Sequence, residues 1–72
     1  MSVFNLKVGE SAKISKISVT GAARDRLTAL GITCGATVTC LGFSLFNSSI
    51  LLGVNAVRVA LRKGVASAIE VA

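Results

Sequence analysis

Short runs of alternating apolar and polar residues recur along this chain, with turn signals between them, and this pattern predicts short β-strands. One further segment repeats its apolar residues with the spacing of a helix. Five short strands and one helix within 72 residues predict a compact, mainly β barrel. The strands are expected at Ala12–Val19, Ala36–Phe43, Ile50–Val54, Val57–Arg62 and Ile69–Val71.

The first predicted strand changes the face on which its apolar residues lie. Ala12 and Ile14 share one parity, whereas Ile17 and Val19 share the other. A regular strand cannot place both pairs on one face, because its side chains alternate strictly. The pattern therefore predicts a β-bulge or a sharp bend near Ser15-Lys16.

A short helix is predicted between the first two strands. Ala23, Leu27 and Leu30 recur at i, i+4 and i+7, which places them in one apolar stripe. Thr20 is suited to the N-cap, and Gly31 is suited to the left-handed residue that ends a helix. A helix of about nine residues is unstable in isolation, so we expect its stripe to pack on the sheet.

The sequence predicts which side chains are buried in the strand Ala36–Phe43 and in the loop after it. Leu41 and Phe43 continue the parity of the threonines before them, so we expect the end of this strand to be covered on both faces. The loop Ser44–Ser49 contains the apolar pair Leu45-Phe46. We expect this pair to close the end of the barrel; the alternative is an exposed hydrophobic anchor for a partner.

The later turns are less regular. Asn55-Ala56 is expected to join two strands as a hairpin turn, although Asn-Gly would be a stronger signal. Lys63-Gly64 is expected to end the fourth strand, and Val65–Ser67 fits a single helical turn.

Composition is strongly apolar, with 53% hydrophobic residues and a mean hydropathy of +0.79. No apolar run approaches the ~18–20 residues of a membrane-spanning helix, and the N-terminus does not resemble a secretory signal. We therefore expect a cytoplasmic protein that is not itself a membrane protein, with one domain over residues 1–72.

The two cysteines are expected to be free thiols. Cys34 and Cys40 are six positions apart, which is roughly 20 Å in extended chain and too far for a disulfide. Cys40 fits the role of a small buried hydrophobe, which is common for free cysteine.

The residues needed for catalysis are not grouped in this sequence. The chain has no histidine, and its only carboxylates, Glu10, Asp25 and Glu70, belong to separate predicted elements. A transition-metal site would have only Cys34 and Cys40, and no glycine pattern matches a phosphate-binding loop. We therefore expect no enzymatic activity, no cofactor and no metal site.

The net charge of +5 is compatible with binding to nucleic acid, to an acidic membrane surface or to an acidic protein. The cations are scattered and the only aromatic residues are three phenylalanines, so nucleic acid is not expected. Arg58 and Arg62 share one strand face, roughly 13 Å apart. Arg24 and Arg26 point about 200° apart on a helix, so at most one of them joins a common patch. The plain interpretation is that these arginines are solvated charges on the surface. The alternative is that they form a docking face for an acidic partner.

Motifs along most of the chain resemble the FeoA family, small cytosolic proteins that accompany the bacterial ferrous iron transporter FeoB. The family pattern runs from Leu-x-x-Gly, through Arg-x-Leu-x-x-Leu-Gly with Pro-Gly after it, to Ala-Leu-Arg and Ala-x-x-Ile-x-Val. The matching residues are Leu6–Glu10, Arg26-Leu27, Leu30–Thr33, Gly35, Ala60–Lys63, Ala66, Ile69 and Val71. Two departures are Cys34, where the family usually has proline, and the loop Ser44–Ser49, which lacks Pro-Leu-Gly-x-Pro.

This resemblance implies an SH3-like barrel with a helix after the first strand. It also implies a non-enzymatic accessory protein that binds the cytoplasmic GTPase region of FeoB and modulates ferrous iron uptake. Arg26, Arg62 and the pair Leu45-Phe46 are the expected contacts, with Arg58 as a further candidate. The alternatives are a free-standing regulatory module related to the C-terminal domain of iron-dependent repressors, or a small basic nucleic-acid-binding barrel. Weak self-association through the strand edges is left open.

Overall fold

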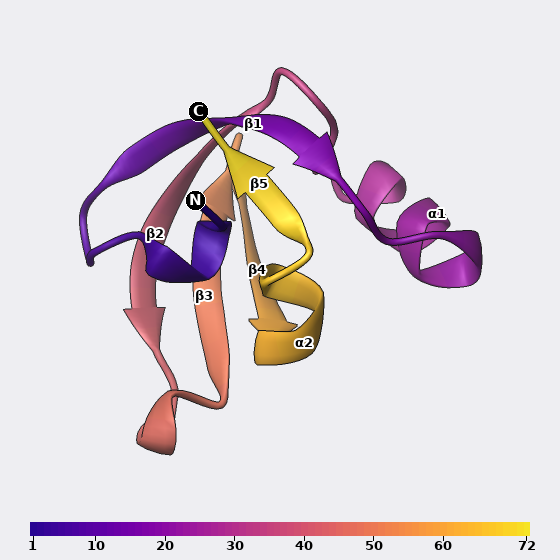
Figure 1. Cartoon of the computed structure of the whole chain (residues 1–72). Helices are drawn as coiled ribbons and strands as arrows, with labels where there is room; N and C mark the ends of the chain where they lie inside the picture. The colour runs from indigo at the N-terminus through magenta and orange to yellow at the C-terminus, as the bar shows by residue number, and fades with distance from the viewer.

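The computed structural model describes residues 1–72 and contains one five-stranded antiparallel sheet (Figure 1). The order across the sheet is β4-β3-β2-β1-β5, so β4 and β5 are its two edges. This confirms the predicted mainly β architecture. The strands are β1 (Ser11–Ile17), β2 (Thr37–Phe43), β3 (Ser49–Val54), β4 (Val57–Arg62) and β5 (Ile69–Val71). The helices are α1 (Gly21–Ala29) and α2 (Lys63–Ala66), with 3-10 turns η1 (Val3–Asn5) and η2 (Leu45–Asn47).

The sheet bends at β1, which pairs with β2 through its first half and with β5 through its second half. The register shifts between Ile14 and Lys16, so the predicted bulge is confirmed. This extra residue brings both Ile14 and Ile17 into the buried core despite their odd spacing.

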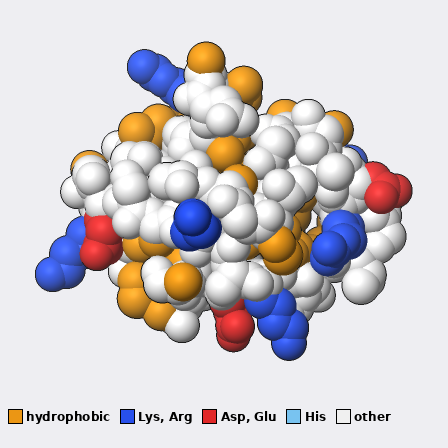
Figure 2. Space-filling view, turned by 90° about the horizontal axis from the view of Figure 1, so that it is seen from above, with side chains coloured by type: hydrophobic (Ala, Val, Ile, Leu, Met, Phe, Trp, Pro, Cys, Tyr) orange, Lys and Arg blue, Asp and Glu red, His pale blue; other side chains and the backbone are white.

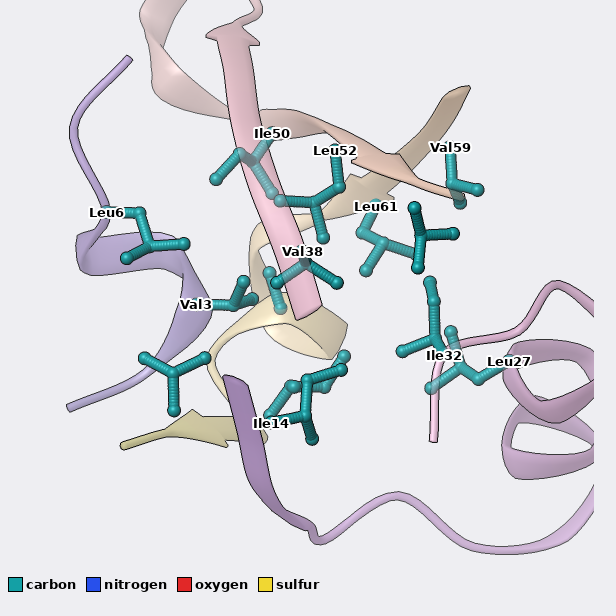
Figure 3. Packing of buried hydrophobic residues seen from close by; sticks show 14 of the residues in the cluster. Val3, Leu6, Ile14, Leu27, Ile32, Val38, Ile50, Leu52, Val59 and Leu61 are labelled. Atoms are coloured by element: carbon teal, nitrogen blue, oxygen red, sulfur yellow. The ribbon is translucent and has the colours of Figure 1, made fainter. Parts of the chain in front are cut away.

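The core consists of buried apolar side chains drawn from every strand and from α1, with no buried polar side chain among them. Figure 3 shows Val3 and Leu6 at one side of this cluster and the adjacent Leu27 and Ile32 at the other. The contribution of Val3 and Leu6 was not predicted, because a single 3-10 turn has no apolar periodicity. The core residues are Val3, Leu6, Ile14, Ile17, Leu27, Ile32, Val38, Cys40, Ile50, Leu52, Val54, Val59, Leu61, Ala66, Ile69 and Val71.

The end of α1 confirms the predicted left-handed glycine. Gly31 has φ +87°, and its N–H donates to the carbonyl of Thr28 at 3.0 Å. The N–H of Ile32 donates to the carbonyl of Leu27 at 2.9 Å, which completes a Schellman motif. Thr20 occupies the N-cap with extended backbone, but its side chain makes no capping hydrogen bond.

The end of β2 differs from expectation. Leu41 and Phe43 remain 41% and 36% exposed, so the predicted cover on both faces is wrong. Leu41 lies over Gly53, which has no side chain of its own, and Phe43 meets Phe4 edge to face. A second register shift falls between Cys40 and Gly42.

The last part of the chain forms a short helix directly after β4. The structure begins α2 at Lys63, two positions before the predicted turn at Val65. Figure 1 shows α2 beside the end of β4, with α1 projecting to one side of the sheet.

Candidate partner-binding surface

The carboxylates and thiols do not converge on a reactive centre. No group of three or more His, Cys, Asp or Glu side chains is placed where it could hold a metal ion. Glu10 accepts a hydrogen bond from the backbone N–H of Lys7 at 2.9 Å, which makes it part of a turn. Cys34 is exposed and Cys40 is buried, both as free thiols, as predicted. None of the helices is both long and apolar enough to span a membrane.

The most exposed apolar side chains belong to Leu45 and Phe46, which are 79% and 90% exposed. The expectation that they close the end of the barrel is therefore wrong. The polar ends of the loop hold the backbone in a shape that turns both side chains outward. Phe46 and Asn47 have φ values of +63° and +53°, in the left-handed region that Asn accepts and Phe rarely adopts.

A hydrogen-bonded cluster around Ser44 fixes this loop. The Ser44 hydroxyl accepts from the backbone N–H of Ser49 at 2.8 Å and shares a 2.9 Å hydrogen bond with the Ser48 hydroxyl. The N–H of Asn47 donates to the carbonyl of Ser44 at 2.9 Å. These bonds compensate the left-handed backbone at Phe46, which costs about 1–2 kcal/mol for a residue other than glycine. Strain retained at an exposed aromatic residue points to a contact surface.

Lys63 lies at the base of the same loop and was not among the predicted contact residues. Its N–H donates to the carbonyl of Ser48 at 3.0 Å, and its ammonium nitrogen lies 5.6 Å from the centre of the Phe4 ring. The Phe4 ring meets Phe43 edge to face at 5.4 Å. A cation–π pair of this kind places a positive charge beside the apolar loop. No sequence signal identifies it, because Phe4 and Lys63 are distant along the chain.

A groove of about 250 Å³ runs between α1 and β4 and brings Arg26 and Arg62 together in its lining. Arg58 is outside this lining, in a separate hollow of about 380 Å³ with Leu41 and Gly53. The loop carrying Leu45 and Phe46 lines neither of these hollows. The groove is lined by Ala23, Arg26 and Leu27 of α1 and its C-cap Leu30, by Val59, Ala60, Leu61 and Arg62 of β4, and by Val65 of α2.

The two helical arginines have different surroundings. The Nη1 atom of Arg24 donates to the carbonyl of Ile17 at 3.1 Å, so Arg24 ties α1 to the end of β1. Arg26 lines the groove instead. This agrees with the prediction that at most one of the two joins a common patch. Figure 2 shows Lys and Arg side chains separated from one another around one face of the molecule.

Comparison with known proteins identifies sequence and structural relatives of this chain. The FeoA domain model matches residues 1–72, whereas comparison with curated protein sequences gives no significant match. The solved structure of the FeoA protein from Chlorobium tepidum is 30% identical, with a TM-score of 0.92 over 99% of this chain and 68% of that chain.

Two further solved structures share the fold. Stenotrophomonas maltophilia FeoA, solved with zinc and described as an SH3 domain protein, is 25% identical, with a TM-score of 0.86 over 100% of this chain and 89% of that one. A manganese-dependent transcriptional repressor is 20% identical, with a TM-score of 0.81 over 96% of this chain and 39% of its own. The predicted SH3-like fold is thus confirmed, and the match along the whole chain shows that this protein belongs to the FeoA family.

Proposed function

We propose that this chain is a non-enzymatic cytoplasmic accessory protein of bacterial ferrous iron transport, which binds the cytoplasmic region of a FeoB-type GTPase transporter and modulates uptake. Family membership supports the process, and the Stenotrophomonas protein is described as a candidate ferrous iron transport activating factor. The observation that carries the binding role is the outward-facing, left-handed loop at Leu45 and Phe46.

Burial of this loop in a complex would supply binding energy at low entropic cost. Covering a Leu or Phe side chain is worth about 1.5–3 kcal/mol. The Ser44 hydrogen bonds already hold the loop, so little backbone freedom is lost on association. Aromatic anchors surrounded by polar residues are typical of interface hot spots.

The arginines at the groove supply the charge for an acidic partner. Arg26 and Arg62 line the same groove, and neither Asp25 nor either glutamate lines it. Opposite charge on the transporter would accelerate encounter and fix orientation. Arg58 lies on the same face of β4 as Arg62 but in the other hollow, where it adds a further positive charge.

Titration calorimetry against the cytoplasmic region of the cognate transporter, with and without guanine nucleotide, tests the proposal. The double change Leu45→Ser with Phe46→Ser is expected to weaken binding at least about tenfold, because two anchors are lost. The matched control is Val8→Ser, since Val8 is also an exposed apolar residue but belongs to a different turn.

The charge contribution is tested by Arg26→Glu and Arg62→Glu, with Lys16→Glu on β1 as the control. Both arginine changes are expected to weaken binding and to reduce its salt dependence, whereas the lysine change leaves affinity nearly unchanged. Absence of binding at roughly tens of micromolar in every nucleotide state would refute the proposed function.

The likeness to the repressor concerns the fold. At 20% identity it supplies no binding residue, so a free-standing regulatory module is the weaker proposal.

A further inference from the structure

Strand β4 is an edge of the sheet with one side unpaired. The N–H of Lys63 donates to the carbonyl of Ser48 at 3.0 Å, and the register pairs Leu61 with Ile50. In an antiparallel ladder, hydrogen-bonded residues alternate with residues whose N–H and C=O point away. Leu61, Val59 and Val57 therefore bond to β3. The outward-pointing N–H groups belong to Arg58, Ala60 and Arg62, none of which takes part in a turn or loop hydrogen bond. Arg62 is also the N-cap of α2, where the carbonyl faces the first turn of that helix, so the free carbonyls are those of Arg58 and Ala60.

The opposite edge of the sheet is covered. The N–H of Val71 in β5 donates to the carbonyl of Met1 at 2.9 Å, and Ser2 forms an isolated bridge with Glu70. The N-terminal segment thus occupies the outer side of β5. The edge of β4 is the one that this chain leaves open.

The groove between α1 and β4 follows this open edge. Its lining includes Val59 and Leu61 from the core side of β4 and Ala60 and Arg62 from the solvent side. A cavity over one face would be lined by residues of one parity only, so the groove lies along the edge itself. Leu27 and Leu30 form its far wall on α1.

The charges on β4 disfavour a second copy of the chain as the occupant. If two copies paired antiparallel about Ala60, Arg58 of one copy would face Arg62 of the other, twice. Like charges directly opposite one another destabilise a strand pair, whereas opposite charges stabilise it. The edge is therefore protected against self-pairing and matched to an acidic strand.

We propose that the free edge of β4 binds an extended acidic segment of a protein partner by strand addition. Acidic side chains lie opposite Arg58 and Arg62, with a small residue opposite Ala60. The two intervening residues are apolar and point into the groove toward Leu27 and Leu30. The proposal deepens the proposed function and rests on it for the identity of the protein that carries the segment.

The test is a titration of the ¹⁵N-labelled chain with the peptide acetyl-Ser-Glu-Val-Ala-Val-Glu-Ser-amide, followed by NMR. Binding is expected to shift amide resonances of β4 and of the groove wall on α1. Hydrogen exchange is expected to slow at the amides of Arg58, Ala60 and Arg62, because these acquire partners. Exchange at Val59 and Leu61 changes little, since both are already bonded to β3. The same peptide with Lys for both Glu is the control.

Two variants distinguish the contribution of backbone hydrogen bonds to peptide binding from the contribution of charge. Ala60→Pro removes the central outward N–H, and an edge strand tolerates proline where that group faces away from the sheet. It is expected to weaken peptide binding at least about tenfold, whereas Ala60→Ser keeps the donor and binds normally. Circular dichroism checks the fold. The charge-reversed chain, with Arg58→Glu and Arg62→Glu, is expected to prefer the Lys peptide, which holds even if the proline variant does not fold.

The proposal is overturned if no shift occurs at about 1 mM peptide, if the shifts lie outside β4 and the groove, or if both peptides bind equally. Sedimentation showing a dimer that Ala60→Pro dissociates would assign the edge to a second copy and would also overturn it. If the transporter binds the Ala60→Pro variant as well as the parent chain, this inference fails while the proposed function stands. If the peptide binds as expected but the transporter does not bind, the proposed function fails alone.

Discussion

A Cβ atom placed on Gly31 would lie 3.2 Å from the side-chain nitrogen Nδ2 of Asn55. The end of α1 therefore touches the turn between β3 and β4, and both residues have left-handed backbone, with φ values of +87° and +54°. A side chain at position 31 is therefore disfavoured both by the left-handed backbone and by the nearby Asn55 side chain.

Gly31→Ala is expected to lower the free energy of unfolding by about 1–2 kcal/mol, because a side chain in the left-handed region is strained. For a chain of this size, each kcal/mol corresponds to a Tm decrease of about 4–8 °C. The control is Gly64→Ala in α2, where added Cβ meets nothing within 4 Å and φ is not positive. An unchanged Tm for Gly31→Ala would contradict the left-handed conformation.

Leu27 and Leu30 are expected to differ as anchors of α1. Leu27 is 3% exposed and belongs to the core, whereas Leu30 is half-buried at the groove. Leu27→Ala is expected to cost about 2–4 kcal/mol and Leu30→Ala about 1 kcal/mol. Urea denaturation measures both. Since the whole stability of such a small domain is about 3–5 kcal/mol, Leu27→Ala will leave a detectable unfolded population. Equal costs at the two positions would contradict this packing.

Phe46→Gly is expected to stabilise the free protein by about 0.5–1 kcal/mol, because relief of the left-handed strain exceeds the added backbone entropy of glycine. The same change should weaken transporter binding, because it removes an exposed aromatic anchor. Thermal denaturation and calorimetry on one sample measure both effects. Asn47→Gly is the comparison, with a smaller gain in stability, since Asn tolerates this conformation. Loss of stability in Phe46→Gly would show that the side chain is packed.

The two thiols are expected to react on different timescales. Cys34 is exposed and should react at once with an aromatic disulfide reagent, whereas Cys40 is buried and should react only as the fold opens. The measurement is the number of thiols modified with and without denaturant. In Cys34→Ser the rapid phase disappears. A rapid phase that persists in this variant would mean that Cys40 is accessible.

Local patterns predicted the parts of the fold that local chemistry determines. The parity change between Ile14 and Ile17 identified the bulge in β1, because both side chains must reach one core. The sequence Leu30-Gly31 identified the helix end, because the Schellman motif requires a left-handed residue at that point.

Features that depend on tertiary placement were not predictable. An apolar pair such as Leu45-Phe46 indicates burial on average, whereas in the folded chain the loop held by the Ser44 hydrogen bonds leaves both side chains exposed. The groove at Arg26 and Arg62 depends on how far α1 stands from β4, and no sequence period encodes that separation. The cation–π pair of Phe4 and Lys63 could not be predicted either, because it depends on how distant parts of the chain are placed in the fold.

The bulge in β1 also sets a length constraint on this part of the chain. Residues before it pair with β2 and residues after it pair with β5, so one extra position keeps the two halves in phase. Deleting Ser15 would place Ile14 and Ile17 two positions apart, so both would still face the core, but β1 would lose the bulge that bends it. Without that bend, β1 would no longer be redirected from its pairing with β2 toward its pairing with β5. Functional variants of this protein should therefore differ in length at the exposed loops and not within Ser11–Ile17.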